Sequence, residues 1–258
     1  MLLPAIVLPL PDPQGIFIPH LEQITPILKS SFERVIINLP PSTRQAQPTA
    51  IQRIESDPFF TCVECPESPI GDHFRALYGY AARICPSGQV LHLCYIDRLA
   101  FALQTDYRQS FLADIQKTNK NHTPLIYQRT EAAWATHPRN YHDVENMVTI
   151  AGQWIFHKTI DFAWCHLAVQ AGQLGEALQR THQPDLSMVA ELVLAMIDTV
   201  NTQDVDWLAW EDPFILGWDA QMLKTERENS LAETRKRLAY VTPMLKLYSN
   251  ILSLSERC

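Results

Sequence analysis

The first half of the chain alternates short apolar runs with segments whose apolar residues recur at helical spacing. Strands are predicted for the short runs, at 5–10, 34–39, 59–65, 90–95 and 124–128. Helices are predicted between them, at 18–28, 43–54, 71–84 and 107–117. Strands separated by helices of this length are typical of right-handed crossovers in a parallel sheet. We therefore expect an α/β fold with a mainly parallel sheet that helices cover on both faces.

After about Arg129 the pattern becomes mostly helical. Apolar helical segments are predicted at 154–171 and 186–200, and a late strand at 205–210. Apolar residues from 231 to 252 then recur at threes and fours, and Thr242-Pro243 predicts a helix start that divides this stretch into two helices. We expect an α/β domain at 1–135 and a mostly helical subdomain at 136–258 that packs on the sheet.

The end of the fourth strand is the first candidate for a binding cleft. Parallel sheets bind ligands beyond the carboxyl ends of their strands, and we expect this strand to end at Tyr95-Ile96-Asp97-Arg98. Asp97 could hold a hard divalent cation that neutralises a phosphate, and Arg98 could contact the phosphate directly. A solvated strand end closed by an Asp97–Arg98 ion pair explains the motif as well.

Two further segments carry candidate binding or catalytic groups. Gly71 and Arg75 stand at a predicted helix start and could bind an anion, although a plain start capped by Asp72 explains them too. Arg129 follows the fifth strand and should leave the sheet on the same side as Asp97. His137 could orient a substrate, bind a metal or act as a base, because its ordinary pKa is near neutrality. A turn residue before a proline is the alternative for His137.

Glu211 and Asp212 follow the predicted late strand. One of these carboxylates could deprotonate the hydroxyl of an acceptor. A capped loop explains them equally well, because acidic residues are common at turns and helix starts.

Composition narrows the class of protein. Apolar residues make up 47% and charged residues 19%, as in ordinary folded domains. The net charge of -7 argues against a general nucleic-acid binder, which needs a basic face. Prolines interrupt the apolar start, and no apolar stretch is long enough to span a bilayer, so we expect a soluble cytoplasmic protein without a membrane span.

The cysteines and the absence of several motifs narrow the class of protein further. The six cysteines are scattered, as is typical of buried thiols in a reducing compartment, and the lone CxxC at Cys62 and Cys65 gives little support for a metal or redox site. The sequence contains no Walker loop, GxSxG, HExxH or GxGxxG. These absences disfavour a P-loop ATPase, a serine hydrolase and a dinucleotide enzyme.

Four segments carry a resemblance to a known family. They are the first strand with its Pro-Asp turn, the second strand before Pro-Pro-Ser-Thr, the Gly71 to Arg75 helix start and the Tyr95-Ile96-Asp97-Arg98 segment. Together they resemble a GT-A fold glycosyltransferase of the nucleotide-diphospho-sugar transferase superfamily. The resemblance covers about the first 130 residues. In that family an Asp-X-Asp holds Mn²⁺ or Mg²⁺ on the diphosphate. Asp97 matches the second acid, whereas Tyr95 stands at the position of the first.

The resemblance implies a sugar nucleotide as ligand and an unidentified acceptor. It places Asp12, Gly71 and Arg75 near the nucleotide, and Asp97 at a Mn²⁺ or Mg²⁺ ion on the diphosphate. Arg75, Arg98 and Arg129 would contribute positive charge there, where a diphosphate leaving group needs it. Either the protein transfers a sugar, or it is a catalytically silent GT-A-like binding or assembly module, as Tyr95 suggests. The apolar helices after Trp154 offer a surface for a homo-oligomer.

Overall fold

The structure is a computed structural model that describes residues 3–118 and 121–255. Within them a seven-stranded sheet has the order β3-β2-β1-β4-β6-β5-β7. Its strands are β1 (Ala5–Pro9), β2 (Val35–Leu39), β3 (Phe60–Glu64), β4 (Val90–Cys94), β5 (Leu125–Arg129), β6 (His166–Gln170) and β7 (Asn201–Val205). β6 runs antiparallel to β4 and β5, and every other pairing is parallel. The expected α/β class with a mainly parallel sheet is therefore confirmed.

Helices cover both faces of the sheet, because its strands send alternate apolar side chains to opposite sides. Ile6 and Leu8 of β1 pack in one core, whereas Ala5 and Val7 pack in the other. The first core is closed by α1 (Ile18–Ser31), α3 (Pro48–Ser56), α5 (Ile96–Gln104) and α6 (Arg108–Lys117). The second is closed by α4 (Ile70–Ile84), α8 (Arg139–Phe156), α9 (Ala171–Leu178), α10 (Ser187–Leu194) and α13 (Leu231–Ser255).

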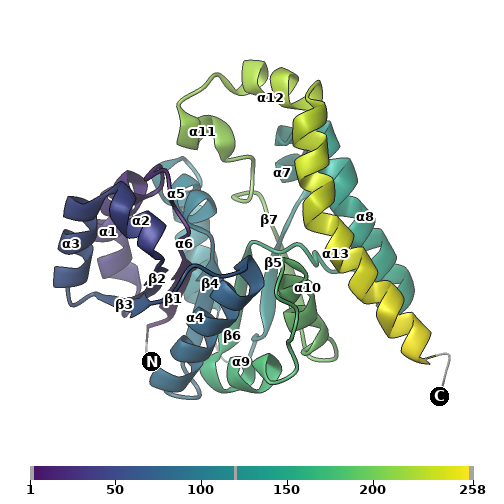
Figure 1. Cartoon of the computed structure of the whole chain (residues 1–258), viewed down its shortest axis with the longest axis horizontal. Coiled ribbons are helices and arrows are strands. Elements are labelled where there is room, and N and C mark those ends of the chain that lie inside the picture. Colours follow the sequence, from purple (N-terminus) through teal and green to yellow (C-terminus); the bar gives the residue numbers. More distant parts are fainter. Residues whose placement is uncertain (1–2, 119–120, 256–258) are drawn as a thin grey trace.

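The second half of the chain contributes a pair of long helices and several short ones. In Figure 1, α13 lies beside α8 as a long pair at one side of the molecule, and α11 (Asp212–Leu216) and α12 (Ala220–Glu228) bridge from the sheet toward it. The remaining helices are α2 (Pro41–Ala46) and α7 (Glu131–Thr136). None of the helices in the described ranges combines the length and the apolar character needed to cross a bilayer.

The end of β4 differs from the prediction. The strand ends at Cys94, and Asp97 and Arg98 lie in the first turn of α5, which was not predicted. Asp97 can start a helix because its carboxylate favours the positive end of the helix dipole. The predicted strand end is therefore a strand-to-helix turn, still at the carboxyl edge of the sheet.

One helix prediction and one strand prediction in the second half were wrong. The apolar stretch 154–171 is not one helix, because α8 ends at Phe156 and the stretch continues into β6. The late strand is β7 at Asn201–Val205, not 205–210. Since β6 and β7 pair with β4 and β5, the region after residue 135 contributes two strands to the same sheet as well as its helices.

Two helix predictions also need correction. The segment 43–54 forms two short helices, α2 and α3, which meet at Gln47. The C-terminal stretch is one helix, α13, with Pro243 inside it, not two helices divided at Thr242. Pro243 has no N–H to donate, but the helix continues because Val241, Met244 and Tyr248 on either side of it are buried in the core.

Candidate functional site

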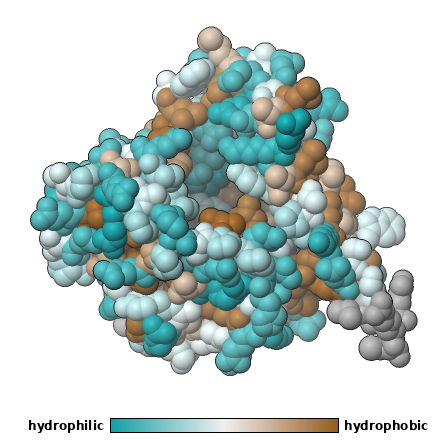
Figure 2. All heavy atoms as spheres, viewed as in Figure 1, coloured by the Kyte–Doolittle hydropathy of each residue, from teal (hydrophilic) through white to brown (hydrophobic). Residues whose placement is uncertain are grey.

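A pocket of about 450 Å³ lies at the carboxyl edge of the sheet. The loop after β1 (Pro9 to Pro11), the turn after β4 (Tyr95 to Arg98) and the end of β5 (Arg129) line it. β6 runs the other way, so the residues that precede it, 163–165, lie at the same edge. The order of the strands reverses between β1 and β4, which is where open α/β sheets bind ligands. Figure 2 shows the recess, with hydrophilic residues in its upper part and hydrophobic residues along its lower edge.

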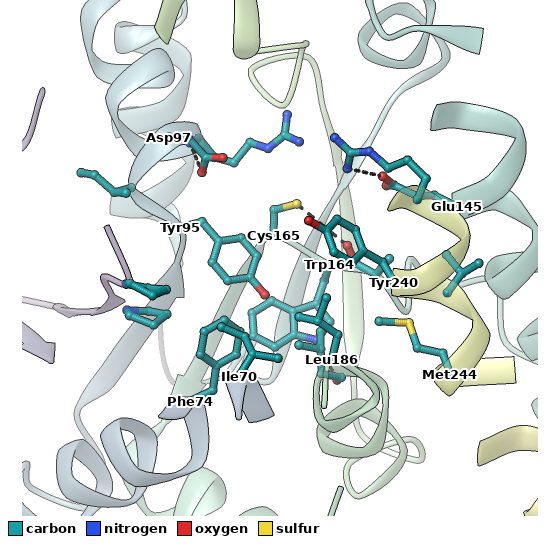
Figure 3. Close-up of a pocket in the computed structure, with 18 of the residues that line it drawn as sticks. Ile70, Phe74, Tyr95, Asp97, Glu145, Trp164, Cys165, Leu186, Tyr240 and Met244 are labelled. Carbon is teal, nitrogen blue, oxygen red and sulfur yellow. Dashed lines mark hydrogen bonds and ion pairs between the residues drawn. The ribbon is translucent and has the colours of Figure 1, made fainter. Parts of the chain in front are cut away.

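Asp97 lines this pocket, as Figure 3 shows. Its Oδ1 accepts a hydrogen bond of 2.8 Å from the backbone N–H of Arg98. No ion pair within 4.0 Å involves Asp97 in the described part of the chain. Burial raises the pKa of Asp97 above its ordinary value, and the charge and backbone N–H of Arg98 offset this only in part. Burial in the pocket therefore disfavours the charged form of Asp97, and a bound cation would stabilise that form.

Arg98 connects two residues that the sequence had suggested separately. The Arg98 side chain is 8% exposed and pairs with Glu211, whose side chain is 2% exposed. Its Nη1 also lies 3.4 Å from Nε2 of His137. Arg98 lines the pocket, whereas Glu211 and His137 do not. Glu211 and His137 thus hold the Arg98 guanidinium in place.

His137 is a neutral imidazole here. Its Nδ1 lies 3.0 Å from the carbonyl oxygen of Ala133, to which it can donate. That leaves Nε2 as the acceptor facing Arg98. Burial, together with the charges of Arg129 and Arg98, lowers the pKa of His137 well below its ordinary value. The pKa of His137 in the fold is therefore not near neutrality, and a positioning role fits it better than proton transfer.

Arg129 lies at the centre of a buried charge cluster. Its Nη1 is 3.0 Å from Oδ2 of Asp161 and 3.2 Å from Oε2 of Glu145, and its Nη2 donates to Sγ of Cys165 at 3.1 Å. Burial alone would lower the pKa of Arg129, but Cys165, Asp161 and Glu145 raise it above its ordinary value. The guanidinium also lies over the Trp134 ring at 4.2 Å. Arg129 is therefore a fixed positive charge in the pocket wall.

Arg237 of α13 adds a third guanidinium to the lining. Its Nη1 contacts Oε1 of Glu145 at 3.1 Å, and its guanidinium lies 3.7 Å from the centre of the Tyr141 ring. The Nε groups of Arg129 and Arg237 are buried without a hydrogen-bond partner. An unpaired buried donor costs about 1–3 kcal/mol, so each of these Nε groups is a local cost to the fold.

The other predicted binding residues do not line the pocket. Asp12 is buried, and its carboxylate accepts hydrogen bonds from the backbone N–H groups of Ile16, Phe17 and Ile18 at the start of α1. Asp12 thus shapes the loop after β1, whose neighbours Leu10 and Pro11 do line the pocket. Asp212 begins α11 next to Glu211, and its charge contributes to the raised pKa of Asp97.

The Gly71 to Arg75 segment binds another part of the chain. The Gly71 N–H donates to the carbonyl of Pro184 at 2.9 Å, and Arg75 donates to the carbonyl of Gln183 at 2.6 Å. Arg75 also pairs with Asp72, whose side chain does not cap the helix. The groups predicted to bind an anion are therefore occupied by the loop that leads to α10.

A single carboxylate is a sufficient protein ligand for some divalent cations. Mg²⁺ is commonly held by one or two carboxylates together with substrate phosphates and waters. Asp97 fits that pattern, with one oxygen on the Arg98 N–H and no cationic side chain paired with it in the described residues. Tyr95 offers no second carboxylate, so the phosphates would have to supply the other ligands.

A second group of possible metal ligands lies elsewhere, in the core. His92, Cys94 and His166 place one ligand atom each within 4.8 Å of one another. His92 Nε2 and His166 Nδ1 share a hydrogen bond of 2.8 Å, and burial lowers the pKa of His92 to about 3. None of the three lines the pocket. Nitrogen and sulfur donors are not the ligands that Mn²⁺ or Mg²⁺ prefers, so this group is not the site that the sequence predicted.

Several pocket residues were not predicted as site residues. Their positions along the chain gave no local cue to the pocket: Glu145, Trp164, Cys165, Arg237 and Tyr240. A strand at 166–170 antiparallel to its neighbours brings two of them, Trp164 and Cys165, to this edge of the sheet. A search against protein-family models and a search of curated proteins both found no match for this chain.

Proposed function

We propose that the protein binds a sugar nucleotide at this pocket and transfers the sugar to an acceptor, as a GT-A-like glycosyltransferase. The observation that carries the proposal is the position of the pocket, at the reversal of strand order between β1 and β4, with Asp97, Arg98 and Arg129 in its wall. A mixed seven-stranded sheet with one antiparallel strand is compatible with such a fold.

The charges of the pocket support a diphosphate ligand. Arg98, Arg129 and Arg237 all line one cavity and bring three guanidinium groups to its wall. Departure of a nucleoside diphosphate places negative charge on its oxygens, and fixed positive groups stabilise that charge without rearranging. Mn²⁺ or Mg²⁺ would be held by Asp97 and the phosphates, and would supply further positive charge at the leaving group.

A thermal-shift series tests the proposal. UDP-, GDP- and ADP-sugars are each added with and without Mn²⁺ to the wild type and to Asp97→Asn. We expect one nucleotide class to stabilise the wild type, by about 2.7 kcal/mol at 100 times its dissociation constant. Asp97→Asn should lose the metal-dependent part of that shift. Absence of a shift with every sugar nucleotide would remove the proposal.

A catalytically silent binding module is the second candidate. It is favoured by Tyr95 at the first acidic position and by the ion pairs that hold the carboxylates of Glu145 and Glu211 on arginines. Sugar-nucleotide turnover distinguishes the two. Hydrolysis or transfer that depends on Mn²⁺ and disappears in Asp97→Asn identifies an enzyme, whereas binding without turnover identifies the silent module.

A further inference from the structure

The pocket has two chemically different ends, which Figure 3 shows together. Asp97 and Glu145 lie at the upper end, whereas the lower end is formed by apolar and aromatic side chains from α4, the turn after β4, α13, the segment before β6 and the start of α10. These lower residues are Ile70, Phe74, Tyr95, Trp164, Leu186 and Met244. We call this lower end the apolar chamber. A diphosphate needs only the upper end, so the chamber is available to another part of the reaction.

The walls of the apolar chamber are fixed in place. Nε1 of Trp164 donates a 3.0 Å hydrogen bond to the carbonyl of Val189. The Tyr95 ring lies nearly parallel to the Trp164 ring, at 10° and 6.5 Å between centroids, and the Phe74 ring is 5.6 Å from that of Tyr95. A preformed apolar cavity binds a matching apolar group without first having to order its own side chains.

Tyr95 joins the two ends of the pocket. Its backbone precedes α5, which carries Asp97, while its ring extends into the apolar chamber with the hydroxyl toward Trp164. Burial raises the pKa of Tyr95 well above its ordinary value, so the phenol stays neutral. The residue that replaces the expected first carboxylate therefore forms a wall of the chamber.

We propose that the apolar chamber binds the acceptor, and that the acceptor is a hydroxyl compound carrying an apolar aryl or alkyl group. The inference rests on the proposed function. The apolar group occupies the chamber, and the hydroxyl points to the charged end, where the sugar is released from the diphosphate. A nucleobase fits the chamber poorly, because its edges need hydrogen-bond partners, and the side chains there are apolar except for the phenol of Tyr95 and the indole N–H of Trp164, which is already bonded.

Calorimetric titration without any sugar nucleotide tests the chamber. The probes are 2-naphthol as an aryl alcohol, 1-octanol as an alkyl alcohol and glucose as a polar control. Leu186→Trp fills the chamber with a larger apolar side chain. Leu194→Trp places the same change on α10 outside the pocket and is the matched control.

We expect 2-naphthol, 1-octanol or both to bind the wild type, glucose to show no binding, and Leu186→Trp to weaken the apolar probe at least tenfold while Leu194→Trp leaves it unchanged. The stronger alcohol identifies the class, aryl or alkyl. Leu186→Ala, which enlarges the chamber, provides a second variant and should still bind the probe.

Three results would overturn the inference. The first is that neither alcohol binds the wild type, and the second is that Leu186→Trp and the wild type bind the alcohol equally. The third is that a nucleotide without its sugar displaces the alcohol, which would mean that the chamber holds the base. Alcohol binding that Leu186→Trp weakens, in a protein that binds no sugar nucleotide, would remove the acceptor role and the proposed function but leave the cavity assignment. Failure of the proposed function is therefore distinguishable from failure of the chamber to bind an apolar alcohol.

Discussion

Asp97 is a carboxylate held where its charge is disfavoured. Its pKa is raised mainly by burial, so the folded protein holds the Asp97 proton more tightly than the unfolded chain does. The stability of the fold therefore falls as pH rises from about 3.8 through the raised pKa. A group that destabilises the fold at neutral pH is a candidate for function, because active sites are where such penalties are tolerated.

Asp97→Asn should raise the stability of the ligand-free protein at pH 7. The amide removes the buried charge, and its oxygen can still accept the hydrogen bond from the Arg98 N–H. Urea unfolding at pH 7 and pH 4 measures the effect, and the gain should be smaller at pH 4, where Asp97 is more protonated. A loss of stability at pH 7 would show that Asp97 is held by favourable interactions.

Glu211 should stabilise the fold through its ion pair with Arg98. Glu211→Gln leaves the buried Arg98 guanidinium without its paired charge, and breaking a buried pair in this way lowers stability by about 3 kcal/mol. Asp212→Asn is the matched control, because the neighbouring Asp212 side chain is only partly buried, and it should change stability by less than about 1 kcal/mol. Equal effects in denaturant unfolding would contradict the pairing of Glu211 with Arg98.

At the scale of elements, α4 and the loop before α10 are joined by a close contact at Gly71. A Cβ on Gly71 would lie 2.5 Å from the carbonyl oxygen of Asp185 and 2.7 Å from that of Gln183. Both neighbours are backbone atoms, so the loop that leads to Leu186 would have to move. The residue that suggested an anion site is therefore required for packing at the edge of the apolar chamber.

Gly71→Ala should lower stability by about 1–3 kcal/mol. Gly79→Ala, on the same helix, meets nothing within 4 Å and should raise stability by up to about 1 kcal/mol through helix propensity. Thermal unfolding of the pair measures the difference. Opposite signs are expected, and a neutral Gly71→Ala would mean that the loop can shift without loss of stability.

The elements that were predicted correctly are those whose apolar pattern is local. β1, β2, β4 and β5 are buried on both faces and read as continuous apolar runs. β7 could not be found in this way, because Asn201 to Asp204 is a polar edge segment with little buried side chain. β6 was hidden inside an apolar stretch whose length suited a helix, and only its pairing with β4 and β5 decides its type.

The position of the site at the edge of the sheet was predictable from the sequence, but most of the residues that line it were not. Asp97, Arg98 and Arg129 follow β4 and β5, and strand direction alone brings them to one edge. Arg237 and Glu145 reach the same cavity from α13 and α8, more than a hundred residues after the first lining loop, and no local pattern connects them. Tyr95 was interpreted as a missing acid, because its stacking on Trp164 depends on β6.

At the scale of the whole molecule, buried histidines should control acid stability. Burial lowers the pKa of His92, His137 and His166, whereas the unfolded chain protonates these groups near pH 6.5. Below that pH the unfolded state binds more protons, so stability should fall as pH drops from about 6.5. Burial raises the pKa of Asp97 and Asp161, which opposes this fall.

Urea unfolding between pH 5 and 7.5 measures the balance. With three neutral histidines against two raised carboxylates, we expect the net loss to reach about 1 kcal/mol per pH unit near pH 5. Asp97→Asn should steepen the loss, since it removes one opposing group. Stability that stays constant or rises toward pH 5 would contradict the neutral state of these histidines.

The most direct test of the central claim is a crystal structure of the protein with the sugar nucleotide that gives the largest thermal shift and with Mn²⁺. The proposed function predicts anomalous density for the ion beside Asp97, the diphosphate against Arg98 and Arg129, and an apolar chamber that the nucleotide leaves open. A nucleotide bound away from the carboxyl edge of β1 and β4, or a pocket without nucleotide density under conditions that saturate the shift, would contradict it.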